Sequence, residues 1–348
     1  MPDYEAVIGL ETHIQLNTAS KIFCGCKADS WQDPPNTNIC PVCTGLPGAL
    51  PALNRAVVEK AARLAAAMHV SEISPRSYFA RKNYFYPDLP KGYQISQYDE
   101  PLARGGTFDL PLPDGHARKV HITKLHVEED AGKTLHRGGR RFIDFNRCGV
   151  PLVEMVTGPD LRTADEVAQY LIRLRQLLRW LEVSDADMER GQLRCDANVS
   201  IRPAGEHGLN PKTEIKNVNS IANVRNAVQA EIERQIREVQ AGRAIETWTL
   251  DWDEERGALS KMRPRRPSPI TATSASRICF RSSWRRIGGR ASCGGCRSCR
   301  WNAGAASSSS TACRSTTRKS SPRNAASRST SSRRWRLSPA SPRPSPTG

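Results

Sequence analysis

The sequence predicts an α+β protein: a polar-faced sheet with packed helices, followed by a tail without regular structure. Short segments that alternate polar and apolar residues recur through the first 263 residues, which is the pattern of half-buried strands. Segments with apolar residues at helical spacing lie between them. Residues 264–348 are rich in Arg, Ser, Pro and Ala and have no hydrophobic periodicity, so their composition indicates disorder or a basic nucleic-acid arm.

The formal charge of +17 is concentrated at one end of the 348 residues. Residues 264–348 hold 18 of the 52 Lys and Arg and no Asp or Glu, so the body of the chain is nearly neutral. No apolar run reaches membrane-spanning length, and the first residues lack the features of a signal peptide. We therefore expect a cytoplasmic protein without a membrane partner, in which cysteines serve metals or redox chemistry more often than disulfides.

The first predicted strand covers residues 6–16 and has one polar face. Alternation places Glu11, His13 and Gln15 on that face and aliphatic residues on the other. A carboxylate and an imidazole two residues apart can hold a hard metal ion or orient a phosphate. The alternative is a half-exposed strand whose outer face is simply polar.

Two close cysteine pairs follow this strand. Cys24 and Cys26 are separated by 13 residues from Cys40 and Cys43, with an Asn- and Pro-rich loop between them. Two thiolate pairs joined by a loop are what a tetrahedral structural zinc ion requires. The alternative is four free thiols.

Residues 52–69 have helical spacing and predict an amphipathic helix. The next segment, residues 81–98, places five aromatic and three cationic side chains among two prolines and a glycine. Such a loop could stack a base and neutralise phosphates, or it could be an aromatic surface turn.

A second polar strand face is predicted within residues 116–135. It carries Lys124, His126, Glu128 and Asp130. Four charged groups of both signs are costly to bury unless a ligand or an ion organises them. A solvated edge strand is the alternative.

The next elements repeat both patterns. Thr163 and Glu166 form a predicted capping box at the start of an amphipathic helix. Two further strands have polar faces, and a long polar helix follows over residues 222–240. The first strand, residues 193–202, carries Asp196, Asn198 and Ser200, and the second, residues 213–216, pairs Glu214 with Lys216.

Four polar strand faces with acidic groups together predict a concave sheet or barrel with a carboxylate-lined mouth. Carboxylates gathered in one cleft favour divalent cations, and Mg²⁺ with a nucleotide phosphate fits best. The chain contains neither a Walker A loop nor a G-x-G-x-x-G motif. A nucleotide would therefore bind through metal and cationic side chains.

These segments resemble the B subunits of the aspartyl/glutamyl-tRNA amidotransferases. The first of them reads Gly9-Leu-Glu-Thr-His-Ile-Gln-Leu16, and the similarity is dense, in the family's order and spans about residues 5–263. The matching segments are residues 9–16, 81–98, 126–133, 144–154, 193–202 and 213–220.

The resemblance implies a cradle-like, β-rich catalytic domain over residues 1–263 that is incomplete at its C-terminal end. It implies ATP- and Mg²⁺-dependent phosphorylation of the side-chain carboxylate of mischarged Glu-tRNA(Gln), Asp-tRNA(Asn) or both. The partners would be amidotransferase subunits A and C: the first releases ammonia from glutamine to displace the phosphate, and the second tethers the pair. The four cysteines match the zinc-bearing form of the family.

The resemblance and the polar faces together select the candidate site residues. As catalytic residues we expect Glu11, His13, Glu128, Asp130, Asp196 and Glu214 around the metals, with Lys216 on phosphate. As magnesium ligands we expect Glu11, His13, Glu128 and Glu214, and as further cofactor-binding residues Lys133 and Asn198. The zinc ligands would be Cys24, Cys26, Cys40 and Cys43.

The similarity stops near Arg263, where the family continues with a Y-R-Y-F strand and E-P-D-L. Residues 270–279 can be back-translated so that reading from the third base gives Y-R-Y-F-R-E-P-D-L. The hypothesis is that one nucleotide is missing near codon 263, which makes residues 264–348 an out-of-frame tail in place of the end of the cradle and the tRNA-binding helical domains. The spacing of Cys293, Cys296 and Cys299 is then accidental.

A second interpretation belongs to another functional class: a non-catalytic, zinc-stabilised RNA-binding module with an Arg/Ser-rich basic arm. It explains the tail but leaves the clustered carboxylates without a role. ATP-dependent phosphorylation of mischarged tRNA separates the two interpretations.

Overall fold

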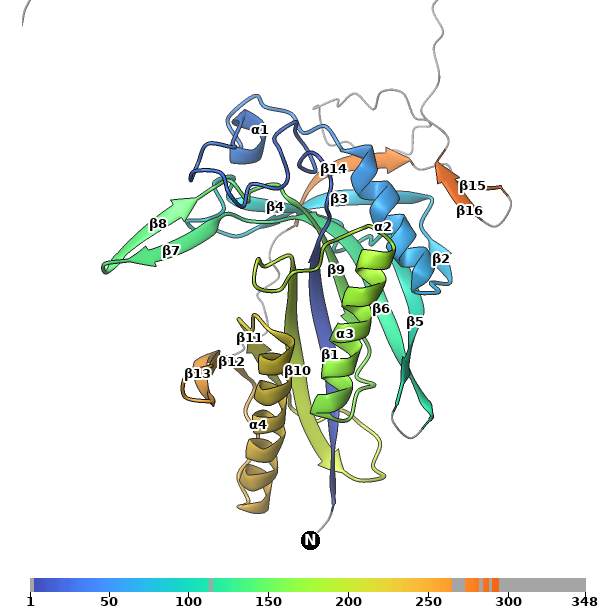
Figure 1. Ribbon diagram of the computed structural model, residues 1–348, viewed down its shortest axis with the longest axis vertical. Coiled ribbons are helices and arrows are strands. Elements are labelled where there is room, and N and C mark those ends of the chain that lie inside the picture. The colour runs from blue at the N-terminus through green and yellow to red at the C-terminus, as the bar shows by residue number, and fades with distance from the viewer. Residues whose placement is uncertain (1–2, 113–114, 265–272, 282–283, 288–289, 294–348) are drawn as a thin grey trace, which may run out of the picture. The chain divides into compact units, whose positions relative to one another are not determined.

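The computed structural model describes residues 3–112, 115–264, 273–281, 284–287 and 290–293, and the predicted strands join one large sheet there (Figure 1). The main path of this twelve-stranded sheet runs β13-β12-β11-β10-β1-β9-β6-β4-β3-β14, and β5 pairs with β6 and β2 at its side. The four strands with predicted polar faces are all members of this sheet. It is an open sheet with two ends, and a mixture of strands and helices confirms the α+β class.

The strands of the first half are β1 (Tyr4–Gln15), β2 (Glu72–Ile73), β3 (Arg76–Asn83), β4 (Tyr93–Ser96), β5 (Ala103–Pro111), β6 (Ala117–Glu129), β7 (Lys133–Arg137), β8 (Arg140–Asp144) and β9 (Pro151–Thr157). Those of the second half are β10 (Leu193–Pro203), β11 (Thr213–Lys216), β12 (Trp248–Asp253), β13 (Ala258–Pro264), β14 (Thr273–Arg281), β15 (Trp284–Ile287) and β16 (Arg290–Cys293). The β7–β8 and β15–β16 hairpins form separate two-stranded sheets.

The helices of the described residues are α1 (Pro41–Thr44), α2 (Arg55–Ala67), α3 (Ala164–Trp180) and α4 (Ile221–Gln240). The predicted helices at residues 52–69, after Thr163 and at residues 222–240 are therefore confirmed. None of the helices in these residues is long and apolar enough to cross a membrane.

Helix α3 begins with half of the predicted capping box. The Thr163 hydroxyl accepts a hydrogen bond from the Glu166 backbone N–H at 3.1 Å, as predicted. The Glu166 carboxylate, however, accepts from the backbone N–H of Arg162 at 2.7 Å and pairs with Arg118 of β6 at 3.0 Å. Because Arg118 holds this carboxylate toward the sheet, Glu166 joins the helix to β6 in addition to capping it.

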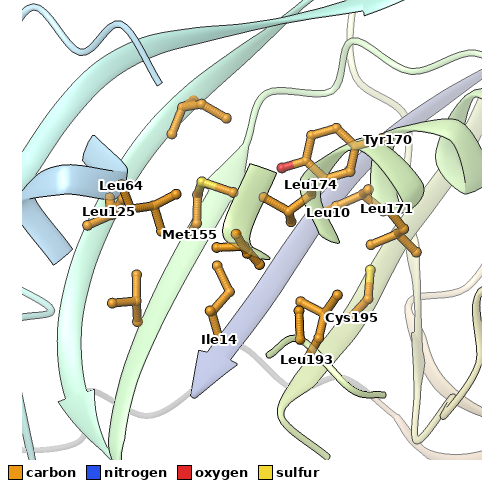
Figure 2. Packing of buried hydrophobic residues seen from close by; sticks show 14 of the residues in the cluster. Leu10, Ile14, Leu64, Leu125, Met155, Tyr170, Leu171, Leu174, Leu193 and Cys195 are labelled. Atoms are coloured by element: carbon orange, nitrogen blue, oxygen red, sulfur yellow. The ribbon is translucent and has the colours of Figure 1, made fainter. Parts of the chain in front are cut away.

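The core lies between the sheet and the helices, on the face of β1 that carries Leu10 and Ile14 (Figure 2). Tyr170, Leu171 and Leu174 of α3 pack against this face and are fully buried. Removing such a leucine side chain to the Cβ costs about 2–5 kcal/mol. This apolar face fixes which side of β1 carries the polar residues, since a shift of one residue would reverse every side chain.

The two strands that pair with β1 come from distant parts of the chain. It pairs antiparallel with β10 on one side and with β9 on the other. Opposite Glu11 lies Asp196, and opposite His13 lie Arg194 on β10 and Glu154 on β9. The register therefore aligns polar residues of three strands on one face.

Strand β6 contains a bulge that decides which residues it contributes to that face. Ile122 pairs with Thr157 and Lys124 with Val156, so Thr123 is one extra residue against β9. Before the bulge, Val120 and Ile122 are buried in the core. After it, the even-numbered residues turn to the polar face, as expected for an inserted residue in a ladder.

The tail was predicted to lack regular structure from residue 264 onward. The backbone of β14 nevertheless pairs antiparallel with β3, with a register irregularity between Ser274 and Ile278. An edge strand offers unpaired N–H and C=O groups, and these can pair with any extended backbone regardless of its side chains. The rest of the tail prediction, including Cys296, Cys299 and Cys313, falls on residues 294–348, outside the described residues.

Candidate active site

Three side chains on the polar face form a group that can hold a divalent cation. His13 of β1, Glu128 of β6 and Glu154 of β9 each offer one ligand atom, and these atoms lie within 4.8 Å of one another. Octahedral coordination at about 2.1 Å places ligand atoms about 3–4.2 Å apart, so small side-chain shifts close this group around Mg²⁺. The set of two carboxylates and one imidazole therefore fits such an ion.

His126 completes a row of alternating imidazoles and carboxylates across three strands. Glu154 Oε2 lies 3.5 Å from His13 Nε2 and 3.6 Å from His126 Nε2. His126 Nε2 also lies 3.3 Å from Glu128 Oε2, which accepts a hydrogen bond from the Ser96 hydroxyl at 3.1 Å. The strand register alone produces this row, since Glu154 lies directly opposite both histidines.

The charges of the row keep Glu154 ionised. Burial raises the pKa of Glu154, but the hydrogen bond with His13 and the nearby His126 and Lys124 lower it to about 2. Burial likewise works against a charged His13, yet Glu154 and Glu128 raise the pKa of His13 above its usual value. A metal ion would bind the carboxylates and the neutral form of His13, so metal binding and protonation of His13 would compete.

A second polar group lies on β10 and β11 beside Glu11. The Asn198 amide donates to Glu11 Oε1 at 3.0 Å. Lys216 Nζ pairs closely with Asp196 and lies 3.2 Å from Glu214 Oε1. Burial works against the charged ammonium, but Asp196 and Glu214 raise the pKa of Lys216. This group therefore presents a fixed cation between two carboxylates.

The predicted magnesium ligands therefore lie in two separate groups. His13 and Glu128 belong to the three-ligand group, whereas Glu11 and Glu214 lie in the second polar group and are not members of it. Glu154 is the third member of this group, and the sequence did not predict it. In the sequence, Glu154 is recognisable only as a single acidic residue inside the apolar run of residues 150–156. Its position opposite His13 follows from the pairing of β9 with β1.

Asp130 has a different partner set from the one expected. It lies just after β6, and its Oδ2 accepts from Gln15 at 2.8 Å and from Arg194 at 2.9 Å, with Arg147 at 3.8 Å. Burial raises the pKa of Asp130, but the charges of Arg194 and Arg147 and the bond from Gln15 outweigh it, and the pKa is lowered. Asp130 therefore fixes Arg194 beside β1.

Cationic and aromatic side chains border the candidate metal ligands. Lys124 Nζ lies 3.5 Å from the centroid of the Tyr98 ring, which stands edge-on to His126 at 5.8 Å. Tyr98 is the last residue of the predicted aromatic loop, which in the structure consists of the end of β3, a connecting loop, β4 and the two residues after β4. Tyr98 is 51% exposed and Phe85 in that loop is 88% exposed, so the first ring contacts Lys124 while half open to solvent and the second lies almost wholly in solvent.

A cavity of about 1030 Å³ opens next to this face. His13, Arg194, Asp196 and Lys216 line it from the sheet, and Lys133 lines it from β7. Lys133 Nζ lies 5.4 Å from the Trp31 ring, which also lines the cavity. The cavity is large enough for a nucleotide, and Lys133, predicted from the sequence as a cofactor-binding residue, reaches it.

The four predicted zinc ligands come together. The Sγ atoms of Cys24, Cys26, Cys40 and Cys43 all lie within 4.8 Å of one another. Tetrahedral zinc at about 2.3 Å from each sulfur needs separations of about 3.8 Å, so the residues fit the ion. The hydrogen bond from Cys24 and that from the Cys40 backbone lower the pKa of Cys43 to about 4, although burial opposes this.

The comparisons with known proteins identify the family of this chain. The family model of the GatB/GatE catalytic domain matches residues 6–269. The chain belongs to this family. The B subunit of the aspartyl/glutamyl-tRNA(Asn/Gln) amidotransferase of Synechocystis sp. is 50% identical over 278 residues, which cover 76% of this chain and 56% of that protein.

Two further GatB relatives give the same picture. The corresponding B subunits of Persephonella marina and Chlorobium chlorochromatii are 51% and 52% identical over 261 and 262 residues, 75% of this chain and 54% of each of those proteins. The chain spans about half the length of the curated relatives it matches. The match covers the polar sheet face and the cysteine cluster, so both belong to the GatB/GatE catalytic domain.

Proposed function

We propose that residues 1–263 form the domain that performs the ATP-dependent activation step of aminoacyl-tRNA transamidation. The substrate would be Glu-tRNA(Gln), Asp-tRNA(Asn) or both, following the names of the relatives. The observation that carries the proposal is the group of His13, Glu128 and Glu154, which fits a divalent cation and lies beside a cavity large enough for a nucleotide.

The chemistry explains why a carboxylate must be activated. An oxygen of the side-chain carboxylate attacks the γ-phosphorus of ATP, the bond to the β-phosphate oxygen breaks and ADP leaves. Ammonia then attacks the acyl carbon, the bond between this carbon and the phosphate oxygen breaks, and inorganic phosphate leaves with the electrons of that bond. The nitrogen loses one proton as the amide forms. A free carboxylate is a poor acyl donor, whereas the acyl phosphate has a good leaving group.

The residues of the polar face would bind and orient the reactants. His13, Glu128 and Glu154 would hold Mg²⁺, whose charge offsets that of the transferring phosphoryl group when it is bound. Lys216 and Lys124 would contact phosphate oxygens, as positioned cations do in phosphoryl transfer. Lys216 is suited to this because Asp196 and Glu214 hold its ammonium in place.

The remaining parts of the proposal follow the GatB relatives. The glutamine-hydrolysing A subunit would release the ammonia, and the C subunit would tether the two chains. A structural zinc ion on the four cysteines would stabilise the loop between β1 and α2. We place the reaction in the cytoplasm, where cysteines remain available to metals.

We also propose that one nucleotide is missing near codon 263, so that residues 264–348 are out-of-frame translation. The family match ends at residue 269. A shifted frame of residues 270–279 can encode Y-R-Y-F-R-E-P-D-L, which is the continuation typical of the family. The nucleotide sequence around codon 263 tests this, and an intact frame that encodes the present tail would overturn it.

The function is tested with a frame-restored chain combined with amidotransferase subunits A and C. Transfer of radiolabelled phosphate from γ-labelled ATP to Glu-tRNA(Gln) should require Mg²⁺ and should be lost in Glu154→Gln. Glu59→Gln is the control, since Glu59 is a partly exposed residue of α2 paired with Arg55, away from the polar face. Binding of tRNA with no phosphate transfer would overturn the proposal and favour the non-catalytic RNA-binding module.

A further inference from the structure

Lys21 is a fully buried lysine next to the cysteine cluster, and the proposed reaction does not use it. Its exposed fraction is 0%. A buried ammonium is costly unless an anion and hydrogen-bond acceptors compensate for its lost hydration. The contacts of Lys21 therefore indicate the group that makes its burial tolerable.

The ammonium of Lys21 has two partners, and one of them is a cluster sulfur. Lys21 Nζ donates to the Asn38 carbonyl oxygen at 2.8 Å and to Cys43 Sγ at 3.8 Å. Among the described residues, no carboxylate forms an ion pair with Lys21. The sulfur of Cys43, when it is a thiolate, is consequently the anionic group that contacts it.

The surroundings hold Lys21 in this position. Its backbone N–H donates a hydrogen bond to the Cys26 carbonyl oxygen at 2.8 Å, within the loop that carries Cys24 and Cys26. Gly149, at φ +79°, lies alongside it: a Cβ there would be 3.6 Å from Lys21 Cδ and 3.4 Å from Cys43 Cβ. The stem of Lys21 is thus packed against the β8–β9 connection, and its ammonium points to Cys43.

A zinc ion bound by four thiolates carries a net charge of −2, and the part of it at the buried Cys43 is the least accessible to water. Cys43 is the buried member of the four and also accepts a hydrogen bond from the Cys40 backbone N–H at 3.1 Å. A backbone N–H supplies a dipole only, whereas Lys21 supplies a full charge. Hydrogen-bond donors around metal ligands commonly alter metal affinity by 10–100-fold.

We propose that Lys21 is an outer-sphere positioning residue of the cysteine cluster, whose ammonium offsets the charge of the zinc tetrathiolate at Cys43 and slows zinc release. The inference rests on the proposed zinc ion. It assigns to Lys21 an electrostatic role that an apolar side chain of the same length cannot replace.

The test compares zinc retention in the purified full-length chain, in Lys21→Met and in Lys27→Met. The methionine side chain is unbranched, like that of lysine, so it can occupy the same buried space. Lys27 is the control because it lies in the same loop but pairs with Asp33 at 2.8 Å and is 58% exposed. Zinc content is measured by elemental analysis, and the release rate is measured with excess chelator.

We expect one zinc ion per chain in the parent and in Lys27→Met, and release about 10–100-fold faster from Lys21→Met. Replacement of zinc by Co²⁺ gives a second readout. Without the N–H donor, the sulfur-to-cobalt charge-transfer band should move to lower energy in Lys21→Met, which a loss of packing alone would not cause. Lys21→Gln keeps a hydrogen-bond donor but has no charge, and it should also release zinc faster than the parent. This variant replaces Lys21→Met in the test if Lys21→Met does not fold.

Two different results would overturn the inference, and they are distinguishable. A parent chain without zinc would refute the zinc site itself. A zinc-loaded parent with unchanged release and an unchanged cobalt band in the Lys21 variants would refute the role of Lys21 alone. Neither result bears on the transfer of phosphate at His13, Glu128 and Glu154.

Discussion

Ile122 and Lys124 are two residues apart on β6, yet their side chains lie on opposite faces of the sheet. Ile122 is in the core, whereas Lys124 lies over the Tyr98 ring beside the candidate metal ligands. Thr123, the extra residue of the bulge, makes this possible. The orientation of His126 and Glu128 toward the candidate site therefore depends on Thr123, which precedes both of them on β6.

Deletion of Thr123 should unfold the chain or remove the site. Without the bulge, either the apolar residues before it or the charged residues after it would face the wrong side, and unpaired buried charges cost several kcal/mol. Thr123→Ala keeps the residue count and should change stability by less than about 0.5 kcal/mol. Urea unfolding followed by circular dichroism measures both, and an unchanged midpoint in the deletion variant would contradict this account of β6.

Substitution of Glu154 should weaken divalent-cation binding more than substitution of Glu11. Glu154 belongs to the three-ligand group, whereas Glu11 accepts a hydrogen bond from Asn198 in the neighbouring group. Mn²⁺ binding, followed by electron paramagnetic resonance as a probe of the Mg²⁺ site, should fall at least tenfold in Glu154→Gln, as loss of a ligand exceeds the usual outer-sphere effects. An equal loss in Glu11→Gln would restore Glu11 to the ligands expected from the sequence.

Cys26→Ser should lose zinc and stability, while Cys148→Ser should keep its zinc. Cys26 is one of the four clustered sulfurs, and Cys148 is a buried cysteine outside the cluster. Because binding energy of a structural zinc ion contributes to folding, the melting temperature of Cys26→Ser should also become insensitive to chelator. Elemental analysis and thermal unfolding with and without chelator give both quantities. Equal zinc content in the two variants would rule out the four-cysteine site.

Asp130 should stabilise the fold at neutral pH and lose this effect in acid. Its folded-state pKa is lowered, so the contribution is fully present above the unfolded pKa of about 3.9 and disappears as pH falls through the lower folded value. Asp130→Asn should cost about 1.5–3 kcal/mol at pH 7, since it leaves Arg194 with a weaker acceptor. Unfolding free energies measured from pH 7 down to pH 2 should converge for parent and variant.

Asp165→Asn is the matched control for Asp130. Asp165 pairs with Arg225 at 2.6 Å, but both side chains are more than half exposed. Exposed pairs contribute about 0–1 kcal/mol, so this variant should follow the parent at every pH. A constant difference between Asp130→Asn and the parent across the whole range would show that the charge of Asp130 is not the cause.

The strands with strict alternation could be predicted from the sequence, because alternation is a local signal. Glu11 and His13 on β1, and Asp196 and Asn198 on β10, were placed on the polar face correctly. The cysteine cluster was also predictable, since its spacing leaves few other uses for four thiols. Which acids would share a metal ion was not predictable, because this depends on the order and register of the strands.

Glu154 illustrates the limit most clearly. Its local sequence is apolar on both sides, so alternation does not distinguish it from a core residue. Its partners, His13 and His126, lie on β1 and β6. They meet Glu154 because β9 lies between these two strands in the sheet. The aromatic loop at residues 81–98 was likewise ambiguous, because its composition does not show which rings turn to Lys124 and which to solvent.

The strand order also has a consequence for the synthesis of the chain. The Thr12 hydroxyl of β1 donates a hydrogen bond to the Met155 carbonyl oxygen of β9, 143 positions later in the chain. The other partner of β1, strand β10, is synthesised still later. At about 5–20 residues per second, roughly 7–30 s pass between the emergence of β1 and that of its first partner. During that interval both edges of this half-apolar strand lack their partners and are open to other extended chains, and His13 cannot yet meet Glu154.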